Sequence, residues 1–211
     1  MADLNQLREA ILRGDSKAAL AVTREAIAEN VDPLDLVTKH MVPAMDEVGR
    51  RFECQEYFVP ELLIAARAMK GALELIRPLL TASGAPSAGS VVIGTVRGDL
   101  HDIGKNLVAS MLEGAGFDVF DLGTDVTPQK FLAEAKAKKA KIVALSALLT
   151  TTMTSMKSTI EEFKKEGVRD QFKFMIGGAP VTQEYADQIG ADGYSENANG
   201  AVSMARKLAG A

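Results

Sequence analysis

The sequence is short of several residue types, and each scarcity excludes a kind of protein. Its single cysteine, Cys54, excludes an internal disulfide and a cysteine-rich metal site. No apolar run approaches the roughly 18 residues that a membrane-spanning helix needs. The net charge is −4, and no run of basic residues predicts a surface for nucleic acid or membrane. Residues 1–6 also lack the charged-then-apolar pattern of a secretion signal, so we expect a cytoplasmic protein.

The first eighty or so residues have the apolar spacing of helices and no strand pattern. Asp32-Pro33 combines a capping residue with proline at the first helical position, and Pro43 is expected to kink the helix that starts there. A further helix is predicted over Pro60–Leu80, with one buried stripe made of Leu63, Ala66, Met69, Leu73 and Ile76. Together these segments predict a helical bundle, which we assign to residues 1–82.

The segment that follows is small, uncharged and rich in helix breakers, and we interpret residues 83–89 as a linker. Beyond it, residues 90–211 alternate between strand and helix patterns. The expected strands are Val91–Thr95, Asp118–Leu122, Ile142–Ala147, Phe172–Ile176 and Gly193-Tyr194. The expected helices are Gly104–Ala115, Pro128–Lys139, Thr152–Gly167, Thr182–Ile189 and Asn197–Leu208. Five such units predict an α/β fold with a flavodoxin-like (Rossmann-type), doubly wound, five-stranded parallel sheet.

In such sheets, ligands bind beyond the carboxyl ends of the strands, where the strand order reverses. The loop after the first strand places His101 two residues after Asp99, between glycines 98 and 104. A metal-bound histidine needs an acceptor on its second ring nitrogen, and a carboxylate serves this purpose. One histidine with one carboxylate is not a complete protein metal site, however, and the only other histidine, His40, lies in the helical half. A metal at His101 would therefore have to arrive inside a macrocycle that supplies its other ligands; an ordinary surface histidine is the alternative.

Two other functions fit this region poorly. Residues 98–106 resemble a phosphate-binding P-loop, but the spacing has one residue too many, and Asn106 stands where Ser or Thr would bind magnesium. A response-regulator receiver needs an aspartate at the end of the third strand, where this chain has Ser146-Ala147-Leu148.

Taken together, Asp99-x-His101-x-x-Gly104, then Ser146-x-Leu148, then Gly177-Gly178 resemble the cobalamin-binding signature of methionine synthase and of the corrinoid proteins of methyltransferase systems. The preceding bundle and linker match the two-part layout of that family, so the resemblance covers nearly the whole chain. The combination of three motif pieces in order is specific, whereas each piece alone is weak.

The resemblance implies a role for each matching position. His101 would bind cobalt from below in place of the cofactor's own base, and Asp99 would accept a hydrogen bond from its other nitrogen. Thr152 matches the hydroxyl residue that completes this relay, with Thr151 as the alternative. The cofactor would also contact the remaining residues of the first loop and a set around its nucleotide tail. These are Gly98, Leu100, Asp102, Ile103, Gly104, Ser146, Leu148, Thr150, Gly177, Gly178 and Ala198.

The bundle of this family caps the upper face of the corrin, and Phe58, Leu62 and Met69 are the expected cap contacts here. The implied function is that of a methyl carrier that is not catalytic alone. A substrate-specific methyltransferase would load a methyl group onto cob(I)alamin, and a second methyltransferase would pass it from methylcob(III)alamin to tetrahydrofolate or coenzyme M. A reductive activating protein is the third expected partner.

Two alternatives share the same binding domain. One is a cobalamin-dependent sensor or regulator, but the chain shows no helix-turn-helix with a basic face. The other is the small subunit of an adenosylcobalamin mutase, which usually lacks the helical cap. The sequence does not indicate the methyl donor, the acceptor or the oligomeric state.

Overall fold

A computed structural model describes residues 2–83 and 88–210, which form two compact units. The first unit is residues 1–86 with 113–116, and the second is residues 87–112 with 117–211. Residues 84–87 of the expected linker lie outside the described residues.

The first unit is helical, as the sequence predicts. Its elements are α1 (Leu4–Leu12), α2 (Ser16–Ala28), α3 (Pro33–Asp35), the π-helix η1 (Leu36–Met41), α4 (Val42–Glu53) and α5 (Val59–Ser83). Carboxylates cap the starts of three of these helices: Asp3 on α1, Asp15 on α2 and Asp32 on α3. Each accepts from free backbone N–H groups of the first helical turn, so the chain has local reasons to begin helices at these positions.

The proline expected to kink the third helix lies just after the π-helix η1. Pro43 has no N–H to donate to the preceding turn, and the ring of a proline crowds the carbonyl four residues earlier. The helical turn is wider here, because the N–H of Val42 donates to the carbonyl oxygen of Val37, five residues earlier. The structure thus shows a local π-segment at the position where the sequence predicts an interruption.

Helix α5 buries four of the five residues of the predicted stripe, Ala66, Met69, Leu73 and Ile76. Leu62, Met69 and Ile76 are fully buried, but Leu63 is 41% exposed, so the assignment of Leu63 to the core is wrong. At the start of the helix, the predicted and the observed buried residues differ by one position. The apolar residues 62–64 offer two adjacent helical stripes, and packing against α2 and α4 selects the stripe that contains Leu62.

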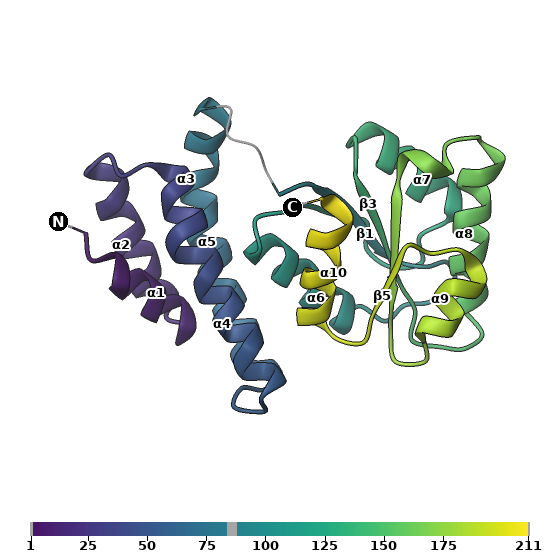
Figure 1. Ribbon diagram of the computed structural model, residues 1–211, viewed down its shortest axis with the longest axis horizontal. Coiled ribbons are helices and arrows are strands. Elements are labelled where there is room, and N and C mark those ends of the chain that lie inside the picture. Colours follow the sequence, from purple (N-terminus) through teal and green to yellow (C-terminus); the bar gives the residue numbers. More distant parts are fainter. Residues whose placement is uncertain (1, 84–87, 211) are drawn as a thin grey trace. The chain divides into compact units, whose positions relative to one another are not determined.

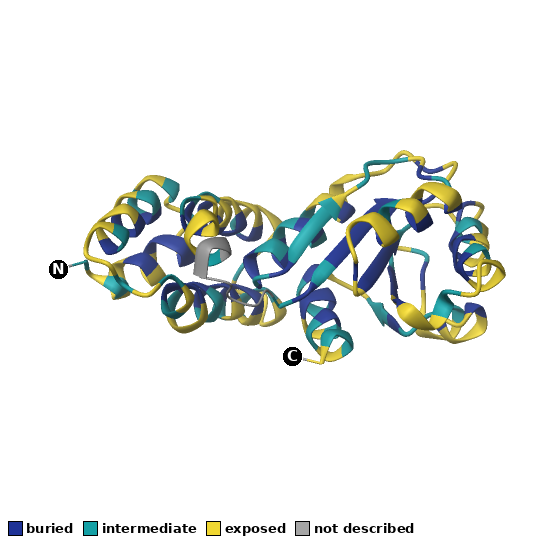
Figure 2. Cartoon of the chain, turned by 90° about the horizontal axis from the view of Figure 1, so that it is seen from above, coloured by how far each residue is buried: buried dark blue, intermediate teal, exposed yellow. Residues whose placement is uncertain are grey.

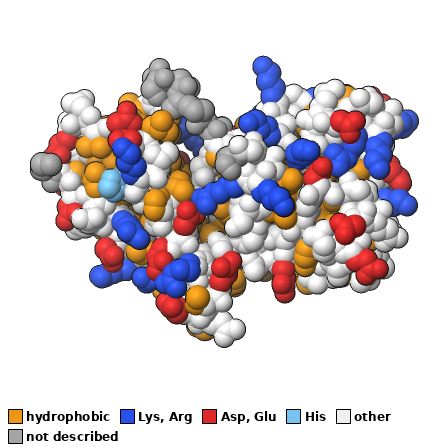
Figure 3. Space-filling view, in the orientation of Figure 1, with side chains coloured by type: hydrophobic (Ala, Val, Ile, Leu, Met, Phe, Trp, Pro, Cys, Tyr) orange, Lys and Arg blue, Asp and Glu red, His pale blue; other side chains and the backbone are white. Residues whose placement is uncertain are grey.

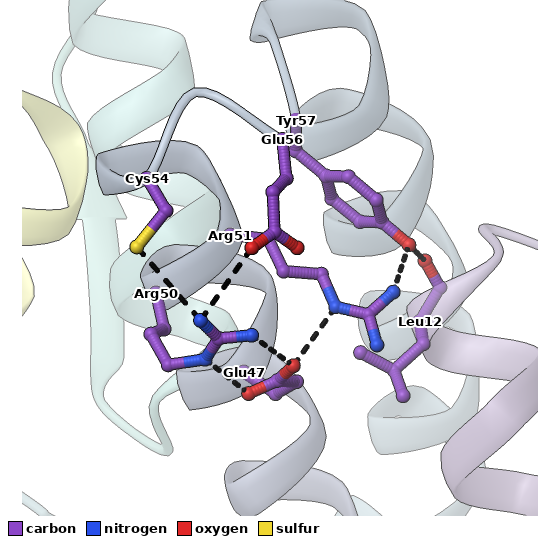
Figure 4. Close-up of polar contacts among 7 residues, drawn as sticks. All are labelled: Leu12, Glu47, Arg50, Arg51, Cys54, Glu56 and Tyr57. Carbon is purple, nitrogen blue, oxygen red and sulfur yellow. Dashed lines mark hydrogen bonds and ion pairs between the residues drawn. The ribbon is translucent and has the colours of Figure 1, made fainter.

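A polar cluster joins α4, the turn after it and α1 (Figure 4). Glu47 accepts hydrogen bonds from Arg50 and Arg51 at 2.8 Å, and Arg51 also donates to the Tyr57 hydroxyl at 3.0 Å. The Tyr57 hydroxyl lies 3.2 Å from the carbonyl oxygen of Leu12 at the end of α1. Hydrogen bonds from Arg50 and then Arg51 lower the pKa of Glu47 to about 2, despite the opposing effect of its desolvation.

Glu47→Gln should therefore destabilise the protein in a pH-dependent way. Because the folded-state pKa of Glu47 is lowered from 4.5 to about 2, its stabilising effect is complete above 4.5 and is lost as the pH falls toward 2. Thermal unfolding should show Glu47→Gln melting below wild type at neutral pH, with the gap closing in that acidic window. Glu25→Gln, at an exposed position of α2, is the control and should match wild type throughout.

The second unit is a five-stranded parallel sheet. Its strands are β1 (Ser90–Thr95), β2 (Asp118–Asp121), β3 (Ile142–Ser146), β4 (Lys173–Gly177) and β5 (Gly193–Ser195), in the order β2-β1-β3-β4-β5. This is the flavodoxin-like order, with the reversal between β1 and β3. The fold class predicted from the sequence is confirmed, and each strand lies within one residue of its predicted limits.

Helices cover both faces of this sheet. They are α6 (Ile103–Gly114), α7 (Pro128–Ala137), α8 (Met153–Lys165), α9 (Gln183–Ile189) and α10 (Ala198–Ala209), with the short 3-10 helix η2 (Arg169–Gln171) before β4. Helices α6 and α10 lie on one side of the sheet, and α7, α8 and α9 lie on the other (Figure 1). The three central strands β1, β3 and β4 are accordingly largely buried, as the dark strands of Figure 2 show. Phe131, Phe163 and Phe174 fill the core beneath α7 and α8.

Charges of both signs are mixed on the face drawn in Figure 3, without a large basic patch. Within the described residues, no helix is both long and apolar enough to cross a bilayer.

Candidate functional site

The carboxyl ends of four strands align at one level of the sheet. Thr95 pairs with Ser146, Ser146 with Gly177, and Gly177 with Ser195. The loops that leave β1, β3 and β4 at this level are those that carry the motif residues. Parallel pairing therefore brings together segments some fifty and eighty residues apart in sequence, and the sequence prediction missed Thr95 and Ser195 on this edge.

Asp99 is the centre of the site and is completely buried. Its Oδ1 accepts from the backbone N–H of His101 at 3.0 Å and lies 2.9 Å from the ring Nδ1 of the same residue. Its Oδ2 accepts from the backbone N–H of Leu148 at 2.8 Å, of Leu149 at 3.3 Å, and from the Thr152 hydroxyl at 2.7 Å. The carboxylate thus joins the loop after β1 to the loop after β3.

These donors also decide the charge of Asp99. Burial by itself raises the pKa of this carboxyl group, but hydrogen bonds from Thr152 and from the backbone of His101 and Leu148, together with the His101 ring, more than offset it. The pKa of Asp99 lies well below its ordinary value, so the group is a carboxylate at neutral pH.

His101 presents one ring nitrogen outward. The side chain is 52% exposed, and its Nδ1 is engaged by Asp99, which leaves Nε2 as the nitrogen for a ligand. The Thr95 hydroxyl donates to the His101 carbonyl oxygen at 2.7 Å and fixes the backbone beneath the ring. An imidazole held in this way is a pre-oriented metal ligand.

The surroundings of His101 suit a large, flat and largely apolar ligand. Leu100 and Ile103 are 75% and 79% exposed, and Leu148 and Leu149 are about half-exposed on the neighbouring loop. Among the described residues, no group of three or more His, Cys, Asp or Glu side chains is placed to hold a metal ion. A metal bound here must therefore carry most of its own ligands, and exposed leucine and isoleucine around a single imidazole fit the lower face of a corrin ring.

Thr152 is the third member of the hydrogen-bonded group, and the structure distinguishes it from its neighbour. Its hydroxyl lies 2.7 Å from Asp99 Oδ2 and 2.8 Å from the Leu149 carbonyl oxygen, whereas the alternative, Thr151, is exposed. Thr152 also occupies the N-cap of α8 without capping it, because its hydroxyl is turned toward Asp99.

Thr152→Val should raise the pKa of Asp99 toward its ordinary value, because the variant loses the hydroxyl that contributes most to lowering it. The expected stability loss is about 1.5 kcal/mol, since a hydrogen bond to a charged group is removed. Urea unfolding measures the stability, and NMR titration of the Asp99 carboxyl carbon measures its pKa. Thr152→Ser keeps the hydroxyl and should behave as wild type; equal losses in Ser and Val would show that packing of the methyl group matters instead.

The residues expected around a nucleotide tail occupy the same edge. Ser146 and Gly177 end β3 and β4, Thr150 is exposed in the loop after β3, and Ala198 is buried at the first turn of α10. Gly178 has φ +136°, and a Cβ there would lie 1.8 Å from the Ala147 carbonyl oxygen. A side chain at position 178 is therefore sterically excluded, and the two edge loops pack directly backbone to backbone.

The remaining predicted positions divide between surface and core. Gly98 turns the first loop with φ +84°, and Asp102 and Gly104 are exposed at the start of α6. Phe58 is 62% exposed, but Leu62 and Met69 are fully buried in the conformation described, so their proposed contact with a cofactor stays a prediction.

Lys105, the lysine of the P-loop-like segment, is buried and paired with Asp121 and Asn106. A lysine committed to these two partners does not hold a phosphate, which agrees with the rejection of a P-loop.

Comparison with known proteins shows the family to which this chain belongs. A family model described as a B12 binding domain matches residues 89–203, and a second B12 binding domain model matches residues 3–77. The chain belongs to the cobalamin-binding family. Cobalamin, and with it cobalt, is therefore the cofactor of this corrinoid protein.

Similar proteins have the same two-part organisation. The chain is 48% identical over 203 residues to "Trimethylamine corrinoid protein 1" of Methanosarcina acetivorans, covering 95% of this chain and 94% of that one. A crystal structure of a cobalamin-binding protein from Desulfitobacterium hafniense matches with TM-score 0.81 and 34% identity, covering 99% of both chains. The methanol:cobalamin methyltransferase complex MtaBC from Methanosarcina barkeri matches with TM-score 0.85 and 30% identity, covering 98% of this chain and 79% of that one.

Proposed function

We propose that this corrinoid protein carries a methyl group from a substrate-specific methyltransferase to a second methyltransferase. The observation that carries the proposal is the group formed by His101, Asp99 and Thr152 at the switch point of the sheet. One exposed imidazole, oriented by a buried carboxylate and surrounded by apolar side chains, is what a corrin cofactor needs from the protein below it. The bound cobalt supplies the bond-making and bond-breaking chemistry of methyl transfer.

The protein's own residues hold and orient the imidazole that would bind cobalt. Nε2 of His101 would bind cobalt, and Asp99 fixes the ring through Nδ1. A cavity of about 390 Å³, lined in part by Arg97, Thr152 and Ser155, gives water access to the Thr152 end of this group.

The helical unit would shield the methyl group from water. Phe58 and its exposed neighbours Val59, Leu63 and Ile64 form an apolar surface on this unit that suits the upper face of a corrin. We assign the cap to residues 1–82, the linker to 83–89 and the cobalamin-binding domain to 90–211. The cap would move aside for each partner methyltransferase.

We propose methylamines as the first donors to test, because the trimethylamine corrinoid protein is 48% identical to this chain. The acceptor would be tetrahydrofolate or coenzyme M, reached through the second methyltransferase. A reductive activating protein would restore cofactor lost to one-electron oxidation, and we expect all of these partners in the cytoplasm. A sensor or a mutase subunit is not favoured by this set of relatives.

The test is reconstitution of the purified chain with cobalamin, followed by addition of each methyl donor with the candidate methyltransferase. We expect stoichiometric cobalamin binding, and a change in the absorption spectrum of the reduced holoprotein only when donor and methyltransferase are both present. Methanol in place of the methylamines is the matched comparison. Failure to bind any corrinoid would contradict the proposal.

A further inference from the structure

We propose that Asp125, in the loop after β2, is a positioning residue that holds the His101 loop in its cobalt-binding conformation. Two hydrogen bonds connect this one residue to the backbone just before His101. The Gly98 N–H donates to Asp125 Oδ1 at 2.7 Å, and the Asp125 N–H donates to the Asp99 carbonyl oxygen at 3.0 Å. The side chain and the main chain of Asp125 therefore hold two consecutive residues of the ligand loop.

The place of Asp125 is itself fixed by the sheet. The segment after β2 continues to pair with β1: Thr95 N–H donates to the Gly123 carbonyl oxygen at 3.0 Å, and Val126 N–H donates to the Thr95 carbonyl oxygen at 2.9 Å. Val96 and Val126 form a further parallel bridge. Asp125 thus stands on a rigid support directly beside the loop that it contacts.

The ligand loop needs such a restraint at Gly98. Gly98 has φ +84°, and a glycine at positive φ has no side chain that limits rotation of the peptide units on either side. The next residue is Asp99, whose carboxylate orients the His101 ring. Any rotation at Gly98 would move the Asp99 carboxylate and the His101 ring together. The Asp125 carboxylate opposes this rotation, because it accepts a hydrogen bond from the Gly98 N–H.

Aspartate at position 125 suits both the backbone conformation there and the hydrogen bond to the Gly98 N–H. Asp125 adopts the left-handed conformation, with φ +53°, which Asp and Asn tolerate better than other side chains except glycine. A carboxylate also makes a stronger bond to a backbone N–H than a neutral acceptor does. Alanine would lose both properties, glycine only the acceptor, and asparagine only the charge.

This inference rests on the proposed role of His101 as the cobalt ligand, and its test separates the two. Wild type, Asp125→Asn, Asp125→Gly and the exposed control Asp170→Gly, before β4 at the other end of the sheet, are each loaded with cobalamin. Titration measures cobalamin affinity. The EPR spectrum of the Co(II) form, recorded with cobinamide, a corrinoid without a lower base of its own, reports coordination by the protein, because a bound protein nitrogen splits the cobalt lines into triplets.

For Asp125→Gly we expect roughly ten-fold weaker cobalamin binding and a fraction of molecules without the nitrogen triplet. Asp125→Asn should restore the triplet and most of the affinity, and Asp170→Gly should equal wild type. Rescue by asparagine separates loop positioning from a general loss of folding.

A wild-type triplet that persists unchanged in Asp125→Gly would overturn the role of Asp125 and leave His101 as ligand. If Asp125→Gly does not fold, Asp125→Ala, which also lacks the acceptor, takes its place, and an unchanged wild-type triplet in folded Asp125→Ala would overturn the role instead. Absence of the triplet in wild type would overturn the ligand assignment and this inference with it.

Discussion

Replacing His101 with alanine should abolish axial nitrogen coordination of cobalt while leaving the protein folded. The ring is half-exposed and packs against no core cluster, so its removal costs little stability. The EPR spectrum of the Co(II) protein loaded with cobinamide, a corrinoid without a lower base of its own, should lose its nitrogen triplet completely. Since changes merely to the residues that orient a metal ligand cost about 10–100-fold in metal affinity, loss of the ligand itself should weaken cobalamin binding by about 100-fold.

The chain provides a matched control for this experiment. It contains only two histidines, and the other one, His40, lies in the π-helix of the helical unit. His40→Ala should keep the triplet and the affinity of wild type. A triplet that survives in His101→Ala would mean that another protein nitrogen binds cobalt, and the ligand assignment would be wrong.

Replacing Asp99 with alanine should affect both stability and coordination. The side chain accepts hydrogen bonds from three backbone N–H groups, the Thr152 hydroxyl and the His101 ring, and it is completely buried. Burying even two of these donors without a partner costs about 1–3 kcal/mol each, so we expect a loss of about 3 kcal/mol or more in the free energy of unfolding. The unanchored His101 ring should also bind cobalt more weakly.

Asp99→Asn refines the test. The amide keeps one acceptor oxygen but directs an NH2 group at donors on its other side, so an intermediate loss of about 2 kcal/mol is expected. Urea unfolding of the apoprotein measures both variants, with exposed Asp170→Ala as the control. Because the folded-state pKa of Asp99 is lowered, the difference between wild type and Asp99→Asn should persist at neutral pH and shrink in acid, below the ordinary aspartate range. Equal stability of wild type and Asp99→Ala at neutral pH would refute the central role assigned to this carboxylate.

The elements of the fold were well predicted by local patterns. Strands buried on both faces appear as short apolar runs, and the capping pair Asp32-Pro33 marks a helix start before any tertiary contact is considered. The first residue of the buried stripe of α5 was not predictable in the same way. Residues 62, 63 and 64 are all apolar, and only packing within the helical unit decides that Leu62 is buried and Leu63 exposed.

The site shows the same division. The spacing Asp99-x-His101-x-x-Gly104 predicted a metal ligand and the carboxylate that orients it, because two residues of one loop can contact each other whatever fold surrounds them. The backbone donors of Leu148 and Leu149 could not be predicted from the sequence, because every residue except proline has an N–H group. Only the pairing of β1 with β3 brings these two N–H groups to Asp99. Asp125 left only a weak signal, a polar residue just after the second strand.

The sequence by itself determined the chemistry available to this protein: one histidine in the α/β half, a carboxylate two residues before it, no second histidine and no cysteine in that half, and the alternation that builds a doubly wound sheet. Only the tertiary structure decided how that chemistry is held. It buries Asp99 completely, selects Thr152 over Thr151, and brings Asp125 beside Gly98. The physical reason is that hydrogen bonds between loops depend on the order and register of the strands, which no single segment of the chain encodes.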